Sequence, residues 1–191
     1  MDTDCQIFDE NNPPRSFEFA PLGRAFASFV KLNQSTMWIT GGFNLYWQDL
    51  MSTLLVTVNG SKNDESLPIH FQGHCIVHYK PSSILIIGGQ QDGVEKSKRT
   101  WIVDVNNRSS LIEGPFLNKG RQHFSCDKVV DRFGHSLILV VGGEDEDTME
   151  VLNATEMKGW AFGKGNCSKK LEYVLTQKHY TYIYCRSKIT I

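Results

Sequence analysis

The chain has 191 residues, of which 40% are hydrophobic and 21% charged, a balance typical of a globular protein. Its formal net charge of −1 provides no basic field, so we expect neither nucleic-acid nor membrane binding. No apolar run approaches the roughly eighteen residues of a transmembrane helix, and the motifs GxSxG, HExxH and GxGxxG are missing. We therefore expect a protein that is not an enzyme and that uses no cofactor and no metal.

In chain order, residues 1–22 predict a strand, an Asn-rich turn and a second strand. Three apolar runs then each stop on two glycines: TMWITGG (36–42), SILIIGG (83–89) and LILVVGG (137–143). A run rich in β-branched residues follows each of them, at 52–60, 99–107 and 147–155. A Gly that precedes a basic residue stands before each of them, at Gly23, Gly73 and Gly120. These landmarks share a period near 48 residues, which indicates a tandem repeat.

Each repeat predicts two strands, the double glycine, a loop and two further strands, with no helical period anywhere. The fold class is therefore all-β, built from four-stranded antiparallel sheets. The second strand is apolar without alternation, so both of its faces should be covered, as when sheets stack around an axis, and we expect the first strand to be buried. The double glycines end that strand where no side chain fits: Gly41, Gly42, Gly88, Gly89, Gly142 and Gly143.

These double-glycine strands, the Gly-basic openers and Trp160 in the expected fourth strand resemble the kelch repeat, a blade of the kelch-type β-propeller. The resemblance implies half a blade (1–22), three blades (23–72, 73–119 and 120–165) and a non-repeat tail (166–191). Tyr180, Tyr182 and Tyr184 alternate with other residues in the tail and predict one more strand. Three and a half blades do not close a ring of the usual four to eight, so self-association through open blade edges is expected.

The family resemblance implies a protein–protein interaction module of the scaffold or substrate-receptor type, with a protein partner. Two alternatives stay open. The chain is a truncated or non-functional propeller fragment, or it is part of a galactose-oxidase-like enzyme, whose Tyr/His copper site would have to draw on the tail tyrosines and His179.

The loops that follow the double glycines differ in chemistry, as expected of a recognition face. The first is aromatic, the second basic and the third acidic, so the candidate partner-binding residues are Phe43, Tyr46, Trp47, Lys96, Lys98, Arg99, Glu144, Asp145, Glu146 and Asp147. The alternatives are that the charged loops are merely solvated and that Tyr46 and Trp47 pack on a neighbouring blade. The acidic loop lacks the spacing of a calcium loop, which favours a solvated turn.

Three histidines, His70, His74 and His78, lie close together in the sequence. Zinc would need further ligands from elsewhere. We place His74 at the position that Arg24 and Arg121 occupy in the other repeats, and therefore expect a structural role. His123 and Cys126, on the first strand of the third full repeat, are expected to pack between blades.

The five cysteines are scattered and odd in number, which favours unpaired thiols over a disulfide framework. Asn-x-Ser/Thr sequons occur at Asn33, Asn59, Asn107, Asn153 and Asn166, although the composition predicts only about 1.5 by chance. Turn chemistry explains part of the excess, because Asn is common in turns. The acidic N-terminus is unlike a signal peptide and slightly favours the cytoplasm, whereas the sequons leave a secreted origin open.

Overall fold

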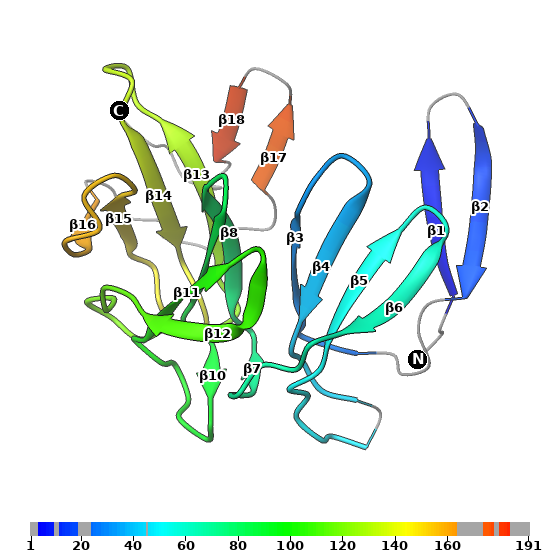
Figure 1. Cartoon of the computed structure of the whole chain (residues 1–191). Coiled ribbons are helices and arrows are strands. Elements are labelled where there is room, and N and C mark those ends of the chain that lie inside the picture. The colour runs from blue at the N-terminus through cyan, green and yellow to red at the C-terminus, as the bar shows by residue number, and fades with distance from the viewer. Residues whose placement is uncertain are drawn as a thin grey trace.

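The protein is all-β, as the sequence predicts. The computed structural model describes residues 4–9, 12–18, 24–44, 46–163, 174–177 and 180–183, and every helix or strand assigned within these ranges is a strand. Consequently, none of the described residues forms a helix that is long and apolar enough to cross a membrane. The strands form three four-stranded antiparallel sheets and three short two-stranded ones (Figure 1).

The three larger sheets, here called blades 1 to 3, each contain four strands in chain order. Blade 1 consists of β3 (Ser28–Lys31), β4 (Thr36–Thr40), β5 (Thr53–Thr57) and β6 (Gly60–Asp64). Blade 2 consists of β8 (Cys75–Lys80), β9 (Ser83–Ile87), β11 (Thr100–Asp104) and β12 (Asn107–Glu113). Blade 3 consists of β13 (Ser125–Val130), β14 (Ser136–Val141), β15 (Met149–Asn153) and β16 (Ala161–Phe162). This is the architecture of a partial β-propeller.

The two-stranded sheets lie outside these blades. β1 (Asp4–Asp9) pairs with β2 (Asn12–Glu18), β7 (Phe71–Gln72) with β10 (Gln90–Gln91), and β17 (Val174–Gln177) with β18 (Tyr180–Ile183). The strand predicted around Tyr180 is therefore confirmed, whereas Tyr184 lies outside the described residues. The division of the chain into half a blade, three blades and a tail stays a prediction.

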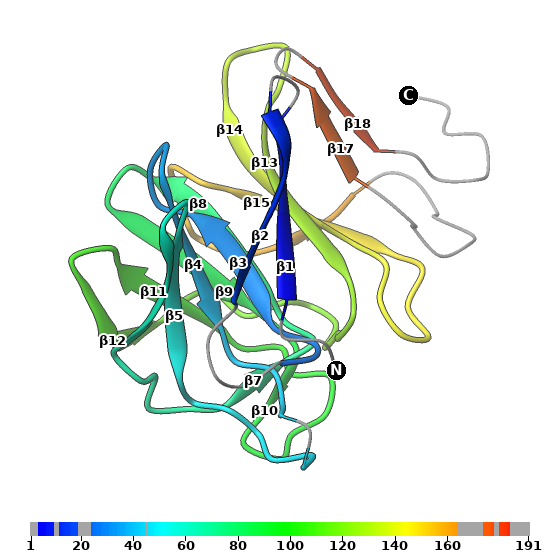
Figure 2. The same ribbon diagram turned by 90° about the vertical axis from the view of Figure 1, so that its right-hand side faces the viewer.

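The hairpin topology gives every blade two distinct ends. With four consecutive antiparallel strands, the turns after the first and third strands lie at one end, which we call the turn face. The loop after the second strand lies at the other end, with the connections between blades, and we call this the loop face. Figures 1 and 2 show β7 and β10 at the loop face and the β13–β14 turn at the opposite end.

The apolar run of β9 is explained by a neighbour on each side of blade 2. Ile84 belongs to a buried cluster that includes Trp38 of blade 1, whereas Leu85 belongs to a cluster that includes Ile138 of blade 3. The next two residues of β9 repeat this alternation, and all four are fully buried. The prediction that both faces of the second strand are covered is confirmed for β9, because alternate side chains contact different blades. It is not borne out for β14, where Ile138 and Val140 are buried but Leu137 and Leu139 are only half-buried.

The expectation that every first strand is buried is wrong for blades 1 and 3. In β8 every residue except the last, Lys80, is buried or half-buried, but Phe29 in β3 is 64% exposed and Val130 in β13 is 66% exposed. The reason is position, since within the described residues only β8 has a first strand on both sides, in contact with β3 and β13.

The double glycines end the second strands at a close approach between blades. Gly41 and Gly88 have φ values of +60° and +55°, the left-handed region that favours glycine. A Cβ atom at Gly41 would lie 2.1 Å from the carbonyl oxygen of Phe71, and one at Gly88 would lie 2.8 Å from that of Arg121. These positions therefore need glycine for both its backbone freedom and its lack of a side chain.

Candidate functional site

Backbone hydrogen bonds between successive blades build the loop face. The second glycine of blade 1, Gly42, donates its N–H to Phe71 O at 2.6 Å, and Gly89 of blade 2 donates to Arg121 O at 2.8 Å. Phe71 therefore holds in blade 2 the position that Arg121 holds in blade 3. The placement of His74 at this position is wrong by three residues. The loops differ in length between repeats, so the glycines alone do not show which residues are equivalent in successive blades.

The opening arginines, Arg24 and Arg121, each hydrogen-bond to the end of the second strand and to the start of the third strand of their blade. We call this arrangement the clasp. Arg24 Nη1 donates to Gly41 O at 3.0 Å and to Ser52 O at 2.9 Å. Arg121 Nη1 donates to the equivalent carbonyls, Gly142 O at 2.8 Å and Thr148 O at 3.0 Å. Each arginine thus donates hydrogen bonds to two backbone carbonyls, that of the first glycine of the pair and that of the residue directly before the third strand. Partial burial lowers the pKa of the Arg24 guanidinium from its usual value.

Blade 2 makes the same clasp with a different residue. Gln91, which is 3% exposed, donates its Nε2 to Gly88 O at 2.7 Å and to Arg99 O at 3.3 Å. Its Oε1 accepts the indole N–H of Trp101 at 3.0 Å. A side-chain amide from the loop therefore replaces the opening arginine, and the sequence repeat conceals this exchange.

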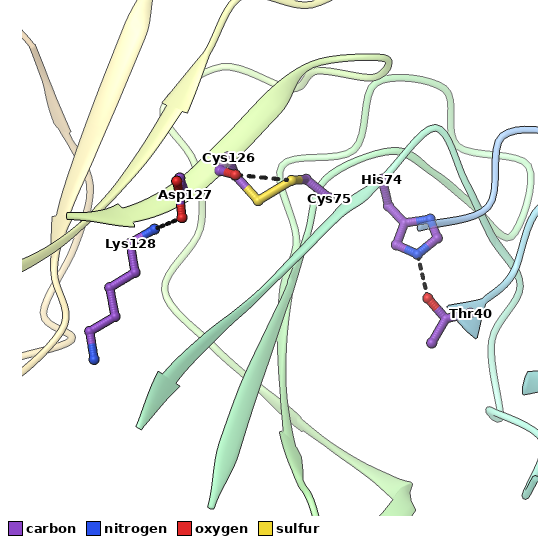
Figure 3. Close-up of a disulfide and its surroundings, with 6 residues drawn as sticks. All are labelled: Thr40, His74, Cys75, Cys126, Asp127 and Lys128. Carbon is purple, nitrogen blue, oxygen red and sulfur yellow. Dashed lines mark hydrogen bonds between the residues drawn. A yellow bond between two sulfur atoms is a disulfide. The ribbon is translucent and has the colours of Figure 1, made fainter. Parts of the chain in front are cut away.

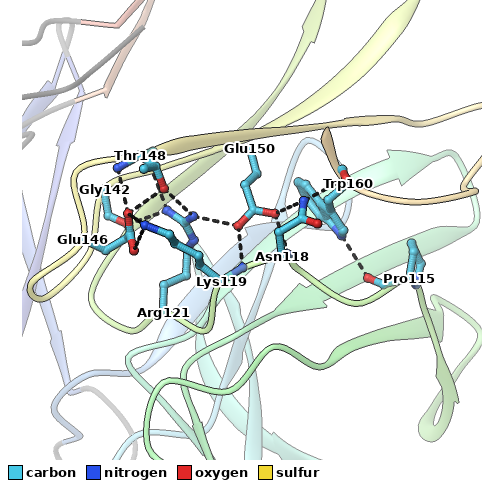
Figure 4. A network of polar contacts seen from close by, with 9 residues as sticks. All are labelled: Pro115, Asn118, Lys119, Arg121, Gly142, Glu146, Thr148, Glu150 and Trp160. Atoms are coloured by element: carbon cyan, nitrogen blue, oxygen red, sulfur yellow. Dashed lines mark hydrogen bonds and ion pairs between the residues drawn. The ribbon is translucent and has the colours of Figure 1, made fainter. Parts of the chain in front are cut away.

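A buried carboxylate, Glu150, organises the clasp of blade 3 (Figure 4). It accepts Arg121 Nη2 at 2.8 Å, and the backbone N–H groups of Asn118 and Lys119 at 2.7 and 3.0 Å. Asn118 Nδ2 also donates to Trp160 O at 2.8 Å. This network fixes the connection from blade 2 against blade 3. Sequence reasoning missed Glu150, because an isolated Glu in a strand carries no motif.

Trp160 joins the same network through its side chain. Its indole N–H donates to Pro115 O at 2.9 Å, and its ring lies in the buried cluster between blades 2 and 3. Thr100 of β11 donates its hydroxyl to the same carbonyl at 3.0 Å. Trp160 therefore contacts the connection between the two blades from the outer part of blade 3.

His74 has a structural role, as expected, although at a different position in the repeat. Its Nε2 lies 2.7 Å from Thr40 Oγ1, so it links the start of blade 2 to the end of β4 (Figure 3). Burial lowers the pKa of the imidazole to about 3, because the charged form loses its hydration. The ring is therefore neutral at physiological pH. His78 lies near Lys80 O and His70 lies between Asp49 and Asp92, so these three histidines do not converge.

The expectation of unpaired cysteines is wrong for two of the five. Cys75 of β8 and Cys126 of β13 form a disulfide that joins the first strands of blades 2 and 3 (Figure 3). The two residues are 51 positions apart. Sequence spacing gave no indication of this pair, because the packing of adjacent blades, rather than a local motif, brings the two strands together. The expected packing role of Cys126 is thus a covalent one.

The aromatic loop of blade 1 contributes to a row of four rings on the loop face. Trp47 stacks on Phe43 at a centroid distance of 4.8 Å, Phe43 lies 5.4 Å from Phe26, and Phe26 stacks on His123 at 4.4 Å. We call these four residues the aromatic row. It reaches from blade 1 to the opening of blade 3. Phe26 and His123 were not among the predicted partner-binding residues, and their place in the row arises only from the packing of blades.

Exposure differs strongly among the predicted aromatic residues. Tyr46 and Trp47 are 77% and 79% exposed, whereas Phe43 is only 6% exposed. Phe43 therefore supports the Trp47 ring from below and offers little surface of its own. Trp47 packs on Phe43 of its own loop. The alternative that Trp47 packs on a neighbouring blade is therefore wrong.

The basic and acidic loops contact each other across blades 2 and 3. Lys96 Nζ lies 2.8 Å from Asp145 Oδ2, and this hydrogen bond raises the pKa of the Lys96 ammonium. Arg99 lies near Glu113 at 4.0 Å and over the ring of Trp101. Lys98 is exposed. Part of the charge on these loops is therefore used to hold the loops together.

The carboxylates of the acidic loop point to separate partners. Glu144 accepts a hydrogen bond from Gln122, and Glu146 contacts Lys119 Nζ at 3.2 Å. Asp147 is exposed. Hydrogen bonds from Thr148 and Lys119 outweigh partial burial and lower the pKa of Glu146. Within the described ranges, no three His, Cys, Asp or Glu residues are grouped to hold a metal ion.

Comparison with known proteins supports the fold but names no family. No family model matches the chain, and no curated protein matches it. Among solved structures, 109 chains match. One of them, described as "Structure of YjhT", matches with a TM-score of 0.59 and 10% sequence identity, over 90% of this chain and 68% of that one. At this identity the likeness concerns the fold alone, and the chain is a β-propeller-like protein made of antiparallel blades.

Proposed function

We propose that the chain is a kelch-repeat interaction module of the scaffold or substrate-receptor type, which binds a protein partner with its loop face and performs no catalysis of its own. The observation that carries this proposal is the aromatic row with the neighbouring Tyr46. Exposed aromatic side chains cost free energy in water and are enriched at the centres of protein interfaces. Two such residues that project at 77% and 79% exposure from one loop are best explained by a partner that covers them.

Hydrogen bonds to Asn44 hold the backbone of Tyr46, Trp47 and Gln48. Asn44, which is 5% exposed, accepts the N–H of Tyr46 at 2.9 Å and that of Gln48 at 3.0 Å through its side-chain oxygen. Its own backbone oxygen accepts the N–H of Trp47 at 3.0 Å. A loop that is ordered before binding loses less conformational entropy on association, which favours affinity.

Charged residues lie on the other two loops of the loop face. Lys98, Asp147 and Arg99 are exposed on the loops of blades 2 and 3, whereas Lys96 and Asp145 pair with each other. A polar rim around an apolar centre is the usual arrangement of a specific interface, in which the centre provides affinity and the rim provides selectivity.

The kelch assignment is supported by how the repeated glycines are used. In blades 1 and 2, the first glycine lies against the backbone of the next blade and its carbonyl is clasped by Arg24 or Gln91. In blade 3, Arg121 clasps Gly142 in the same way. The carbonyl contact thus recurs in all three blades, whereas the lack of room for a side chain holds at Gly41 and Gly88 but not at Gly142, where a Cβ would make only an ordinary contact of 3.7 Å.

Photo-crosslinking tests the proposal. A photoreactive amino acid is placed at Tyr46 on the loop face and, as the matched control, at Phe133, which is 70% exposed in the β13–β14 turn on the turn face. We expect one defined protein to crosslink in cells from position 46 and not from position 133. Equal crosslinking from both positions, or none from position 46, would contradict binding through the loop face.

A further inference from the structure

The Asn-x-Ser/Thr sequons of the described residues all lie on one face of the protein. Asn33 lies in the β3–β4 turn, Asn59 in the β5–β6 turn, Asn107 at the first position of β12 and Asn153 at the last position of β15. These are the turns after first and third strands, which define the turn face. Asn166 lies outside the described residues. The loop face, which carries the aromatic row, contains no sequon within the described part of the chain.

Three of these asparagines present their side chains to solvent. Asn33, Asn59 and Asn107 are exposed, whereas Asn153 is half-buried and accepts two backbone N–H groups of its own turn. Exposure is needed because a glycan is bulky and hydrophilic and must remain in water. Asn33, Asn59 and Asn107 are therefore the acceptors that the fold leaves accessible.

At two of these sites the sequon residues already contact each other. Asn33 Oδ1 accepts the backbone N–H and the hydroxyl of Ser35 at 2.9 and 3.1 Å. Asn107 Oδ1 accepts the hydroxyl of Ser109 at 3.2 Å. These bonds use the amide oxygen, and within the described residues Nδ2 of neither asparagine donates a hydrogen bond. A substituent on Nδ2 would consequently break no hydrogen bond between Asn33 or Asn107 and another described residue.

The Cys75–Cys126 disulfide points independently to the same compartment. Disulfides persist in oxidising environments such as the lumen of the secretory pathway and are rare where thiols are kept reduced. N-linked glycosylation of sequons is a modification of secreted proteins. One location thus accounts for both the sequon excess and the covalent link between blades.

We propose that Asn33, Asn59 and Asn107 are N-glycosylation sites and that the protein matures in an oxidising secretory compartment. In the modification, Asn Nδ2 loses a proton and forms a C–N bond with the anomeric carbon of an oligosaccharide. The donor is a lipid-linked oligosaccharide, whose lipid diphosphate leaves. The glycans cover the turn face and leave the loop face uncovered. The inference does not depend on the proposed partner, since it uses neither the aromatic row nor the charged loops.

The protein isolated from the cells that make it provides the first test. Peptide-N-glycosidase F converts a glycosylated Asn to Asp, and the reaction in ¹⁸O-water labels each converted site for mass spectrometry. We expect labelled peptides at Asn33, Asn59 and Asn107, and a Cys75–Cys126 linked peptide that resists alkylation until it is reduced. Unlabelled sequon peptides together with freely alkylated Cys75 and Cys126 would overturn the proposal.

A pair of adjacent serines provides a matched control. The full chain is directed into the secretory pathway of cultured cells, and its size is compared before and after the glycosidase. We expect Ser109→Ala to remove one glycan, whereas Ser110→Ala, which belongs to no sequon, leaves the glycan in place. A secreted, folded protein whose size is unaffected by Ser109→Ala would show that Asn107 is not an acceptor.

Discussion

Arg121 Nη2 lies 2.8 Å from Glu150 Oε1, and both side chains are fully buried. Removal of one partner from a buried ion pair leaves an uncompensated charge, which typically costs about 3–5 kcal/mol. We therefore expect Arg121→Met to lower the free energy of unfolding by about that amount, measured by urea denaturation. Arg24→Met is the matched control, because Arg24 makes the same clasp without a carboxylate partner among the described residues, and it should cost clearly less. Equal losses would show that the Glu150 carboxylate is not the source of the effect.

Gln91 should contribute to the stability of blade 2 much as the arginines contribute to the other two blades. Gln91→Ala leaves the carbonyls of Gly88 and Arg99 and the indole N–H of Trp101 without this partner. An unsatisfied buried polar group costs about 1–3 kcal/mol, and we expect a loss in that range by urea denaturation. Gln90→Ala, at the neighbouring half-buried position of β10, serves as the control. A loss at Gln90 as large as that at Gln91 would contradict the clasp.

Substitutions at Gly88 and Gly93 distinguish the two reasons why this fold needs glycine, which are a positive φ and the lack of room for a side chain. Both have positive φ, but a Cβ at Gly88 would lie 2.8 Å from Arg121 O, whereas nothing lies within 4 Å of one at Gly93. Gly93→Ala should cost only the left-handed backbone strain of about 1–2 kcal/mol. Gly88→Ala should cost more, because blade 3 must also move away. Thermal unfolding of the two variants measures the difference. Similar midpoints would show that blades 2 and 3 leave room for a side chain at Gly88.

His74 makes stability depend on pH. The pKa of its imidazole is about 3 in the folded protein against 6.5 for a free side chain. Between these values the unfolded chain binds one more proton than the folded one, so stability falls as the pH decreases, by about 1.4 kcal/mol per pH unit from this group. We expect the wild type to lose about 2 kcal/mol more than His74→Gln between pH 6.5 and pH 5, because Gln does not titrate. Parallel pH profiles of the two proteins would indicate that His74 is not buried in its neutral form.

The repeated elements of the fold were predictable from the sequence, because their causes are local. The unalternated run Ser83–Ile87 indicates a strand covered on both faces, and β9 has a blade on each side. The strand Tyr180–Ile183 was likewise predicted from the alternation of Tyr180 and Tyr182 with other residues. The apolar run of β14 shows the limit of this reasoning, because Leu137 and Leu139 are only half-buried in the structure.

Contacts between blades were not predictable, since they depend on register and packing. The period alone placed His74 where Phe71 lies, and it did not indicate that Gln91 replaces an arginine. The partners of Cys75 and Glu150 come from segments far away in the chain. The loop aromatics Tyr46 and Trp47 were identified from composition, but the burial of Phe43 beneath Trp47 is a result of the fold.

The most direct test of the central claim, that the loop face binds a protein, is the affinity of the crosslinked partner for two alanine variants. Trp47→Ala removes an exposed ring from the aromatic row, and Phe133→Ala removes a similarly exposed ring from the turn face. Truncation of an interface hot spot costs about 2 kcal/mol or more. We expect Kd, measured by calorimetry, to rise about thirtyfold or more for Trp47→Ala and to be unchanged for Phe133→Ala. An unchanged Kd for Trp47→Ala, with the variant folded, would show that the partner does not bind through the aromatic row.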